Sequence, residues 1–198
     1  MSSYKTLYYD TPDYKSYIEH HNGKLNRIKI RFREYIDTGL TFLEVKLKNN
    51  KEKTVKSRVK RAEIEEKLSS FSKDYIEKHS FYNANELQPT LWNRFSRITL
   101  VHKVEKERLT IDLNLKFQHY QTKETIPISY MIIAEVKQAK KSVNSDFIQV
   151  MKNRTIRPTG VSKCCIANAL LNKELKANNF KQRILKVKKL ENVRSTTA

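Results

Sequence analysis

Residues 27–33 read Arg27-Ile28-Lys29-Ile30-Arg31-Phe32-Arg33, with a cation at each odd position and an apolar side chain at each even one. Successive side chains of a β-strand point to opposite faces of its sheet. This stretch therefore predicts a strand with one cationic face and one apolar face. The apolar face must be covered by other parts of the chain.

The same alternation appears in other segments that we predict to be strands. Their polar faces carry Glu44, Lys46 and Lys48; Lys56, Arg58 and Lys60; Arg108 and Asp112; Glu135 and Lys137; and, in a less regular segment, Arg94. The solvated face of an ordinary antiparallel sheet explains any one of these strands. Across five strands this explanation weakens, because cations outnumber carboxylates and like charges opposite one another are destabilising. A bound polyanion would offset that repulsion.

Strand and helix patterns divide most of the chain. Strands are predicted at about 4–9, 27–35, 41–48, 54–60, 91–101, 107–117 and 128–138, and helices at 62–79, 145–153, 162–177 and from about 180. These elements predict an α+β fold, an antiparallel β-barrel tunnel with a cationic lumen and helices packed outside it. Residues 1–178 would form the tunnel domain, and residues 179–198 a basic C-terminal helix or tail.

The overall charge indicates anionic partners. The 198 residues include 40 Lys and Arg against 21 Asp and Glu, which gives a formal net charge of +19. Nucleic acid, acidic lipid headgroups and polyphosphate all fit such a charge. The three glycines form neither a Walker loop nor a glycine-rich dinucleotide turn. Side-chain cations would therefore hold most of any bound phosphate.

Cysteine and hydropathy patterns exclude further classes of protein. Cys164 and Cys165 are adjacent, and no second pair exists. This favours a reduced cytosolic protein without a disulfide framework or a zinc site. No apolar stretch approaches the roughly 20 residues of a membrane span, and Met1–Asp10 lacks the apolar core of a signal peptide.

Several short motifs follow one another in a fixed order. They are Leu7-Tyr8-Tyr9-Asp10-Thr11-Pro12, the Lys29/Arg31 strand, Leu43-Glu44-Val45-Lys46, Lys56-Ser57-Arg58, Ile111-Asp112-Leu113-Asn114-Leu115, Ala134-Glu135-Val136-Lys137 and Gly160-Val161-Ser162-Lys163. Over roughly residues 4–175 the chain resembles the VTC (vacuolar transporter chaperone) domain, the polyphosphate polymerase domain of the triphosphate tunnel superfamily. The resemblance implies a barrel that transfers the γ-phosphate of ATP to a growing polyphosphate, with Mn²⁺ or Mg²⁺ as the cofactor. It also implies a cytoplasmic location at a membrane surface, beside an integral membrane partner.

The resemblance further implies which residues act. Catalytic roles fall to Lys29, Arg31, Arg94, Arg108 and Lys163, phosphate binding to Lys46, Lys56, Arg58, Lys137 and Ser162, and metal binding to Glu135. Ser162 and Lys163 would begin a helix, whose N–H groups and dipole favour a phosphate. Asp112 either supports the metal or pairs with a nearby cation. The family has an earlier strand than the first one in this chain, so we expect that strand to be missing.

Other functions remain open on the sequence alone. A tunnel of this type could hydrolyse tripolyphosphate or nucleoside triphosphates, or bind polyphosphate without catalysis. A nucleic-acid-binding protein fits the charge, but neither a recognition helix nor an RRM-like aromatic pattern is present. The segment Glu63-Ile64-Glu65-Glu66-Lys67 matches the E-x-E-x-K metal motif of other tunnel enzymes. Its helical spacing instead favours an ion pair between Glu63 and Lys67.

Overall fold

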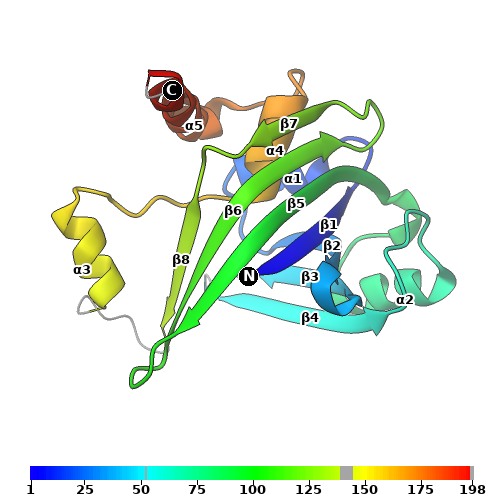
Figure 1. Ribbon diagram of the computed structural model, residues 1–198. Helices are drawn as coiled ribbons and strands as arrows, with labels where there is room; N and C mark the ends of the chain where they lie inside the picture. Colours follow the sequence, from blue (N-terminus) through cyan, green and yellow to red (C-terminus); the bar gives the residue numbers. More distant parts are fainter. Residues whose placement is uncertain (52, 139–144, 197–198) are drawn as a thin grey trace.

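The computed structural model describes residues 1–51, 53–138 and 145–196 (Figure 1). Its strands form one curved antiparallel sheet in the order β4-β3-β2-β1-β5-β6-β7, and β8 pairs with the remaining part of β6. The strands are β1 (Ser2–Asp10), β2 (Arg27–Tyr35), β3 (Leu40–Lys48), β4 (Thr54–Arg61), β5 (Gln88–Val101), β6 (Glu107–His119), β7 (Thr125–Ile128) and β8 (Ile133–Gln138). The antiparallel sheet predicted from the alternation is therefore present.

The last predicted strand, 128–138, is two strands rather than one. A turn follows β7, where the N–H of Met131 donates to the carbonyl of Ile128 at 3.2 Å. The turn lets β7 pair with the C-terminal half of β6 and β8 with its N-terminal half. The long β6 strand thus carries two short neighbours along one edge.

The helices differ more from the prediction than the strands do. They are α1 (Lys15–His21), α2 (Ser70–His79), α3 (Asp146–Asn153), α4 (Lys163–Leu171) and α5 (Lys181–Thr196). The predicted helix over 62–79 is wrong before Ser70, since Ser69 is the N-cap and Glu65 accepts from Arg61 and from the Ser69 N–H at 2.8 Å each. None of the helices in the described residues is long and apolar enough to cross a bilayer.

Helix α1 was not predicted, because its seven residues have no clear apolar period. The buried carboxylate of Asp10 at the end of β1 holds the helix start. It accepts hydrogen bonds from the N–H groups of Ser16 at 2.8 Å and Tyr17 at 3.0 Å. A side-chain acceptor of this kind satisfies N–H groups that a helix start leaves free.

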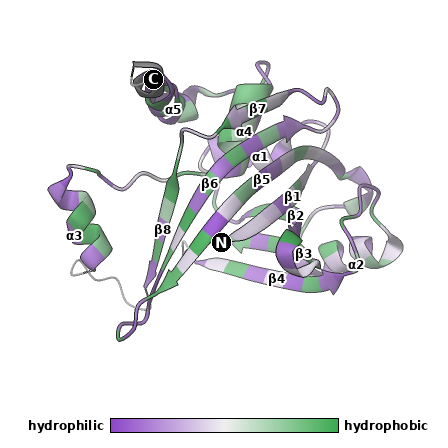
Figure 2. Cartoon of the chain, viewed as in Figure 1, coloured by the Kyte–Doolittle hydropathy of each residue, from purple (hydrophilic) through white to green (hydrophobic). Residues whose placement is uncertain are grey.

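One face of the sheet is apolar and is covered by α2. Leu7 of β1, Phe32 of β2 and Leu43 of β3 lie in register on this outer face and are fully buried. Ile76 of α2 packs into the same cluster, together with Leu68 from the segment before the helix. The apolar half of the strand alternation, visible as alternating colours along the strands in Figure 2, thus forms a core as predicted.

Helix α4 lies on the opposite, inner face and not outside the sheet as expected. At one end of the molecule the inner face is itself apolar, with Tyr8, Leu91 and Phe117 in the same cluster as Ile166 and Ala167 of α4. The alternation of β2 does not predict this apolar region, because its residues come from β1, β5 and β6. Helix α4 therefore fills one end of the inner face and leaves the other end polar.

The described strands do not close into a barrel. β4 lies at one edge of the sheet and β7 and β8 at the other, and no ladder among the described residues joins the two edges. The observed architecture is thus a curved open sheet with α2 on its outer face and α4 on its inner face (Figure 1).

The packing of α4 predicts a stability effect. Ile166 is 1% exposed within the inner cluster. We expect Ile166→Ala to lower the free energy of unfolding by about 2–5 kcal/mol, because it removes buried methylene groups and leaves a cavity. Urea unfolding measures this loss, and Val101→Ala, at a side chain 71% exposed, is the matched control. An equal small loss in both variants would contradict the inner position of α4.

Candidate functional site

The polar end of the inner face carries many cations, on the strands at either side of β1. Strand register places the following side chains on it, and they are called the basic tract: Arg27, Lys29, Arg31, Arg33, Lys46, Lys48, Lys56, Arg58, Lys60, Arg97, Arg108 and Lys137. Lys29, Lys46 and Lys56 stand directly opposite one another on three adjacent strands. Like charges in that position repel one another, so the tract favours binding of an anion.

A buried carboxylate stabilises the middle of the basic tract. Glu44 is 0% exposed and its Oε2 accepts a hydrogen bond from Arg31 Nε at 2.7 Å. Arg31 Nη2 lies 2.6 Å from the same oxygen in the ion pair, and Oε1 contacts Lys56. Arg31 donates in addition to the Tyr8 hydroxyl at 3.1 Å. Burial alone would raise the pKa of Glu44, but the nearby cations, Arg31 first, lower it to about 2. Glu44 is therefore ionised at neutral pH and fixes Arg31.

A second buried carboxylate joins the sheet to helix α4. Asp112 of β6 accepts from Arg97 of β5 in a bidentate pair, at 2.5 and 2.8 Å, and also from Lys163 at the start of α4. The Lys163 ammonium lies 4.7 Å from the centre of the Phe95 ring. Burial would raise the pKa of Asp112, but its hydrogen bonds with Arg97 and the charge of Lys163 lower it. Of the two roles considered for Asp112, the structure shows pairing with cations.

Arg33, Arg58 and Lys46 of the tract form no ion pair with a carboxylate among the described residues. Arg33 donates to Thr6 Oγ1 at 3.3 Å and stands over the rings of Tyr4 and Phe95. Arg58 stands over the Phe42 ring at 4.8 Å. Burial, followed by repulsion from Arg31, lowers the pKa of Lys46 to about 7. These groups hold a positive potential that neighbouring protein charges do not neutralise.

The start of α4 faces the basic tract. Ser162 is the N-cap of this helix, with its hydroxyl accepting the N–H of Cys165 at 3.3 Å. Lys29 Nζ donates to the same hydroxyl at 2.7 Å. The predicted Ser162-Lys163 helix start is therefore present, and the positive end of the helix dipole adds to the cations of the tract.

Glu135 lies on edge strand β8, opposite Thr110, on the same face as the tract. Its side chain is 53% exposed, and its nearest cation is Lys137 at 3.6 Å. The described residues contain no cluster of three or more His, Cys, Asp or Glu side chains that could hold a metal. A single accessible carboxylate does not form an all-protein cage. It fits a cation that is shared with substrate phosphates, as Mg²⁺ commonly is.

The structure brings most of the predicted site residues together and separates one. Lys29, Arg31, Lys46, Lys56, Arg58, Arg108, Lys137, Ser162, Lys163 and Glu135 all face the same side of the sheet. Arg94 lies opposite Lys5 of β1 in the strand register, on the outer face of the sheet, and is exposed. Arg97 is the residue of β5 that lies on the inner face. Arg33 lies on the cationic face as the alternation of β2 predicts, although the prediction gave it no role in the site. Phe95 and Arg97 are two residues apart in β5 and therefore lie on the same, inner face. Because Phe95 is apolar, the sequence did not indicate that this face of β5 is the one that carries the cations.

The comparisons with known proteins agree with this geometry. The family model of the VTC domain matches residues 1–172. The chain belongs to the VTC domain family. No curated protein matches the chain.

Solved structures show the fold of this VTC domain. A proposed adenylate cyclase from Bacillus halodurans has a TM-score of 0.52 and 11% identity, covering 81% of this chain and 79% of that one. At this identity the likeness shows a shared fold and no more. A proposed adenylyl cyclase from Hippeastrum, described as having a dominant triphosphatase activity, aligns at 14% identity over 88% of this chain and 86% of that one. Its TM-score of 0.46 is too low for any argument.

The Glu44 cluster predicts a large loss of stability in one variant. Glu44→Gln removes the negative charge that Arg31 and Lys56 share and leaves both cations in a partly buried site. We expect the free energy of unfolding to fall by about 3–5 kcal/mol, the range for breaking a buried ion pair. Urea unfolding at neutral pH measures the loss. Glu63→Gln, at an exposed position, should change stability by less than about 0.5 kcal/mol.

The same cluster fixes the direction of the pH dependence. Because the pKa of Glu44 is about 2 in the folded protein and 4.5 in its ordinary state, its stabilisation is complete above pH 4.5. It is lost as pH falls from there toward 2. Between pH 4.5 and 2 the free energy of unfolding should therefore fall less for Glu44→Gln than for the wild type. An equal fall in the two proteins would contradict the low pKa of Glu44.

Proposed function

We propose that this VTC domain is a metal-dependent polyphosphate polymerase, which transfers the γ-phosphate of ATP to a polyphosphate chain held along the basic tract. The observation that supports this is the row of Lys29, Lys46 and Lys56 across three adjacent strands. Neighbouring strands lie about 4.8 Å apart, so the row offers evenly spaced positive charges. A linear chain of phosphates is the anion whose charges repeat in the same way.

The proposed site divides into fixed and mobile cations. Arg31 and Arg97 are held by the carboxylates of Glu44 and Asp112, which leaves their orientation set before substrate binds. Guanidinium groups held in this way suit directional contacts with phosphate oxygens. Lys29, which donates to the neutral Ser162 hydroxyl, and Lys46, whose pKa is about 7, form no ion pair among the described residues, so their ammonium groups can shift toward bound phosphates. The first kind positions the substrate, and the second balances its charge.

Phosphoryl transfer requires positioning and charge stabilisation more than covalent chemistry. The acceptor is a terminal phosphate that is already anionic near neutral pH, so no strong general base is needed. Glu135 would hold the divalent cation jointly with phosphate oxygens. That cation would neutralise negative charge on the transferred γ-phosphate and on the ADP that leaves. Lys163 at the start of α4 would contact the phosphates once it exchanges part of its contact with Asp112.

One assay separates the proposed reaction from its alternatives. The protein is incubated with ATP and Mn²⁺, and the products are run on a gel stained for polyphosphate. We expect long chains. Free phosphate alone would identify a hydrolase, and tight binding of added polyphosphate without turnover would identify a binder. Either of these results would overturn the polymerase.

The metal role of Glu135 predicts a selective loss of turnover. Glu135→Gln keeps the size of the side chain and removes its charge, so we expect polymerisation to fall about 10- to 100-fold, the usual range for loss of a group that supports a metal site. Polyphosphate binding should stay near the wild-type level, because the cations of the tract remain. Glu105→Gln, in the exposed β5–β6 turn, is the control and should be fully active. Wild-type turnover in Glu135→Gln would contradict the metal role.

The low pKa of Lys46 leads us to expect that phosphate binding depends on pH. Its pKa of about 7 means that the free protein loses this positive charge as pH rises through 7. We expect the affinity for tripolyphosphate to fall over that range, and binding near pH 7 to take up protons. Calorimetry in two buffers of different ionisation enthalpy measures the uptake. Lys46→Met should remove the uptake and Lys51→Met should keep it, so equal uptake in the two variants would contradict the assignment.

A further inference from the structure

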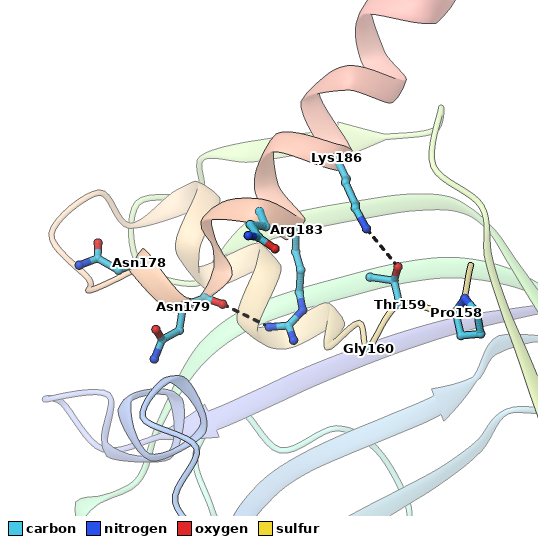
Figure 3. A pocket seen from close by; sticks show the side chains of 8 residues that line it. Pro158, Thr159, Gly160, Asn178, Asn179, Arg183 and Lys186 are labelled. Atoms are coloured by element: carbon cyan, nitrogen blue, oxygen red, sulfur yellow. Dashed lines mark hydrogen bonds between the residues drawn. The ribbon is translucent and has the colours of Figure 1, made fainter. Parts of the chain in front are cut away.

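A polar cavity lies between the loop before α4 and the start of helix α5, and the residues of α5 that line it lie beyond the residues that match the family model. It has a volume of about 460 Å³ and is lined by residues of the loop before α4, of the 3-10 turn Asn178–Phe180 and of α5, among them Thr159, Gly160, Asn179, Arg183 and Lys186. Figure 3 shows Arg183 and Lys186 extending from α5 toward this loop. They are three residues apart in the helix and therefore share one of its faces. The cavity is called the α5 pocket.

The contacts of both cations leave them available for a ligand. Arg183 donates to the carbonyl of Asn179 at 3.3 Å, and Lys186 donates to Thr159 Oγ1 at 3.4 Å. Both bonds are near the upper limit of length and go to neutral acceptors. No acidic residue lines the pocket, and the described residues contain no ion pair of either cation. An anion in the pocket would therefore meet two cations without having to displace a carboxylate.

The α5 pocket lies next to the end of the basic tract. Gly160 on its wall is two residues before Ser162, whose hydroxyl accepts from Lys29 of the tract at 2.7 Å. Asn179 on another wall is bound to α1, where its N–H donates to His21 Nε2 at 3.2 Å and its side-chain amide to the His21 carbonyl at 2.7 Å. Loop and helix are thus both anchored beside the N-terminal end of β2.

His20, next to His21, lies within the field of both groups of cations. Burial lowers its pKa most, followed by Lys29, Arg27, Arg183 and Lys48, and together they bring it to about 3. Three of these cations belong to the basic tract and one to the α5 pocket. His20 is therefore neutral at physiological pH, and cations of both the tract and the α5 pocket lie close enough to act on it.

We propose that the α5 pocket is an extension of the polyphosphate site, which holds the part of the chain that passes beyond Lys29 and leaves the inner face. This inference rests on the proposed function. It assigns Arg183 and Lys186 to contacts with phosphates that the basic tract does not reach. A short phosphate chain fits within the tract, so the pocket matters only for long chains.

The test compares a short and a long ligand on one pair of variants. Affinity is measured for tripolyphosphate and for a long polyphosphate in wild type, in Arg183→Gln/Lys186→Gln, and in Lys188→Gln/Lys189→Gln. The last variant removes the same charge from the same helix at exposed positions outside the pocket lining. We expect the pocket variant to bind long polyphosphate about tenfold more weakly at low salt, from the loss of two phosphate contacts, and tripolyphosphate as the wild type does. The control variant should stay within about twofold of wild type for both ligands.

The outcomes distinguish the two proposals. Equal losses of long-chain affinity in the pocket and control variants would overturn the extension, because only the net charge of α5 would then matter. A loss of tripolyphosphate affinity in the pocket variant would also overturn it, because the pocket would then belong to the short-chain site. If the wild type binds neither ligand, the proposed function itself fails. Thermal unfolding of each variant confirms that the fold is intact before affinities are compared.

Discussion

The buried ion pairs of Glu44 are the interaction on which the rest of the inner face depends. A sheet with lysines and arginines on three adjacent strands would be pushed apart by its own charge. Glu44, fully buried between Arg31 and Lys56, offsets this repulsion at the centre of the tract. It does so without neutralising the whole surface, since Lys46 and Arg33 next to it keep no carboxylate partner among the described residues. One carboxylate thus reduces the repulsion between the strands and leaves other cations of the face unpaired, in the described part of the chain, for the proposed anion.

The second constraint is the division of the inner face into an apolar end and a charged end. Helix α4 packs on the apolar end through Ile166 and Ala167, and its first turn then faces the charged end. Asp112 joins the two regions, because it binds Arg97 of the sheet and Lys163 of the helix. Packing and electrostatics are therefore coupled, since the hydrophobic docking of α4 is what positions Ser162 and Lys163 beside the proposed substrate.

The proposed function follows from this arrangement and from membership of the VTC domain family. The tract supplies repeated cations, Glu135 supplies one accessible carboxylate, and the α5 pocket supplies two further cations beyond the family match. Glu135 is exposed and on an edge strand, whereas Glu44 and Asp112 are buried and bound to cations. On this difference in burial we base the assignment of two carboxylates to structural roles and the proposal that Glu135 holds a metal shared with phosphate.

The sequence by itself determined the strands, their two faces and most of the tract. The period-two alternation of residues 27–33 requires that Lys29, Arg31 and Arg33 share a face, whatever covers the other. It could not determine which face α4 covers, which side of β5 is the inner one, or whether the sheet closes. Each of these depends on contacts between distant segments, as shown by Arg94, which lies outside, and Arg97, which pairs with Asp112. Local periodicity is fixed by backbone geometry, whereas helix placement and the choice of ion-pair partners are decided only when the whole core packs.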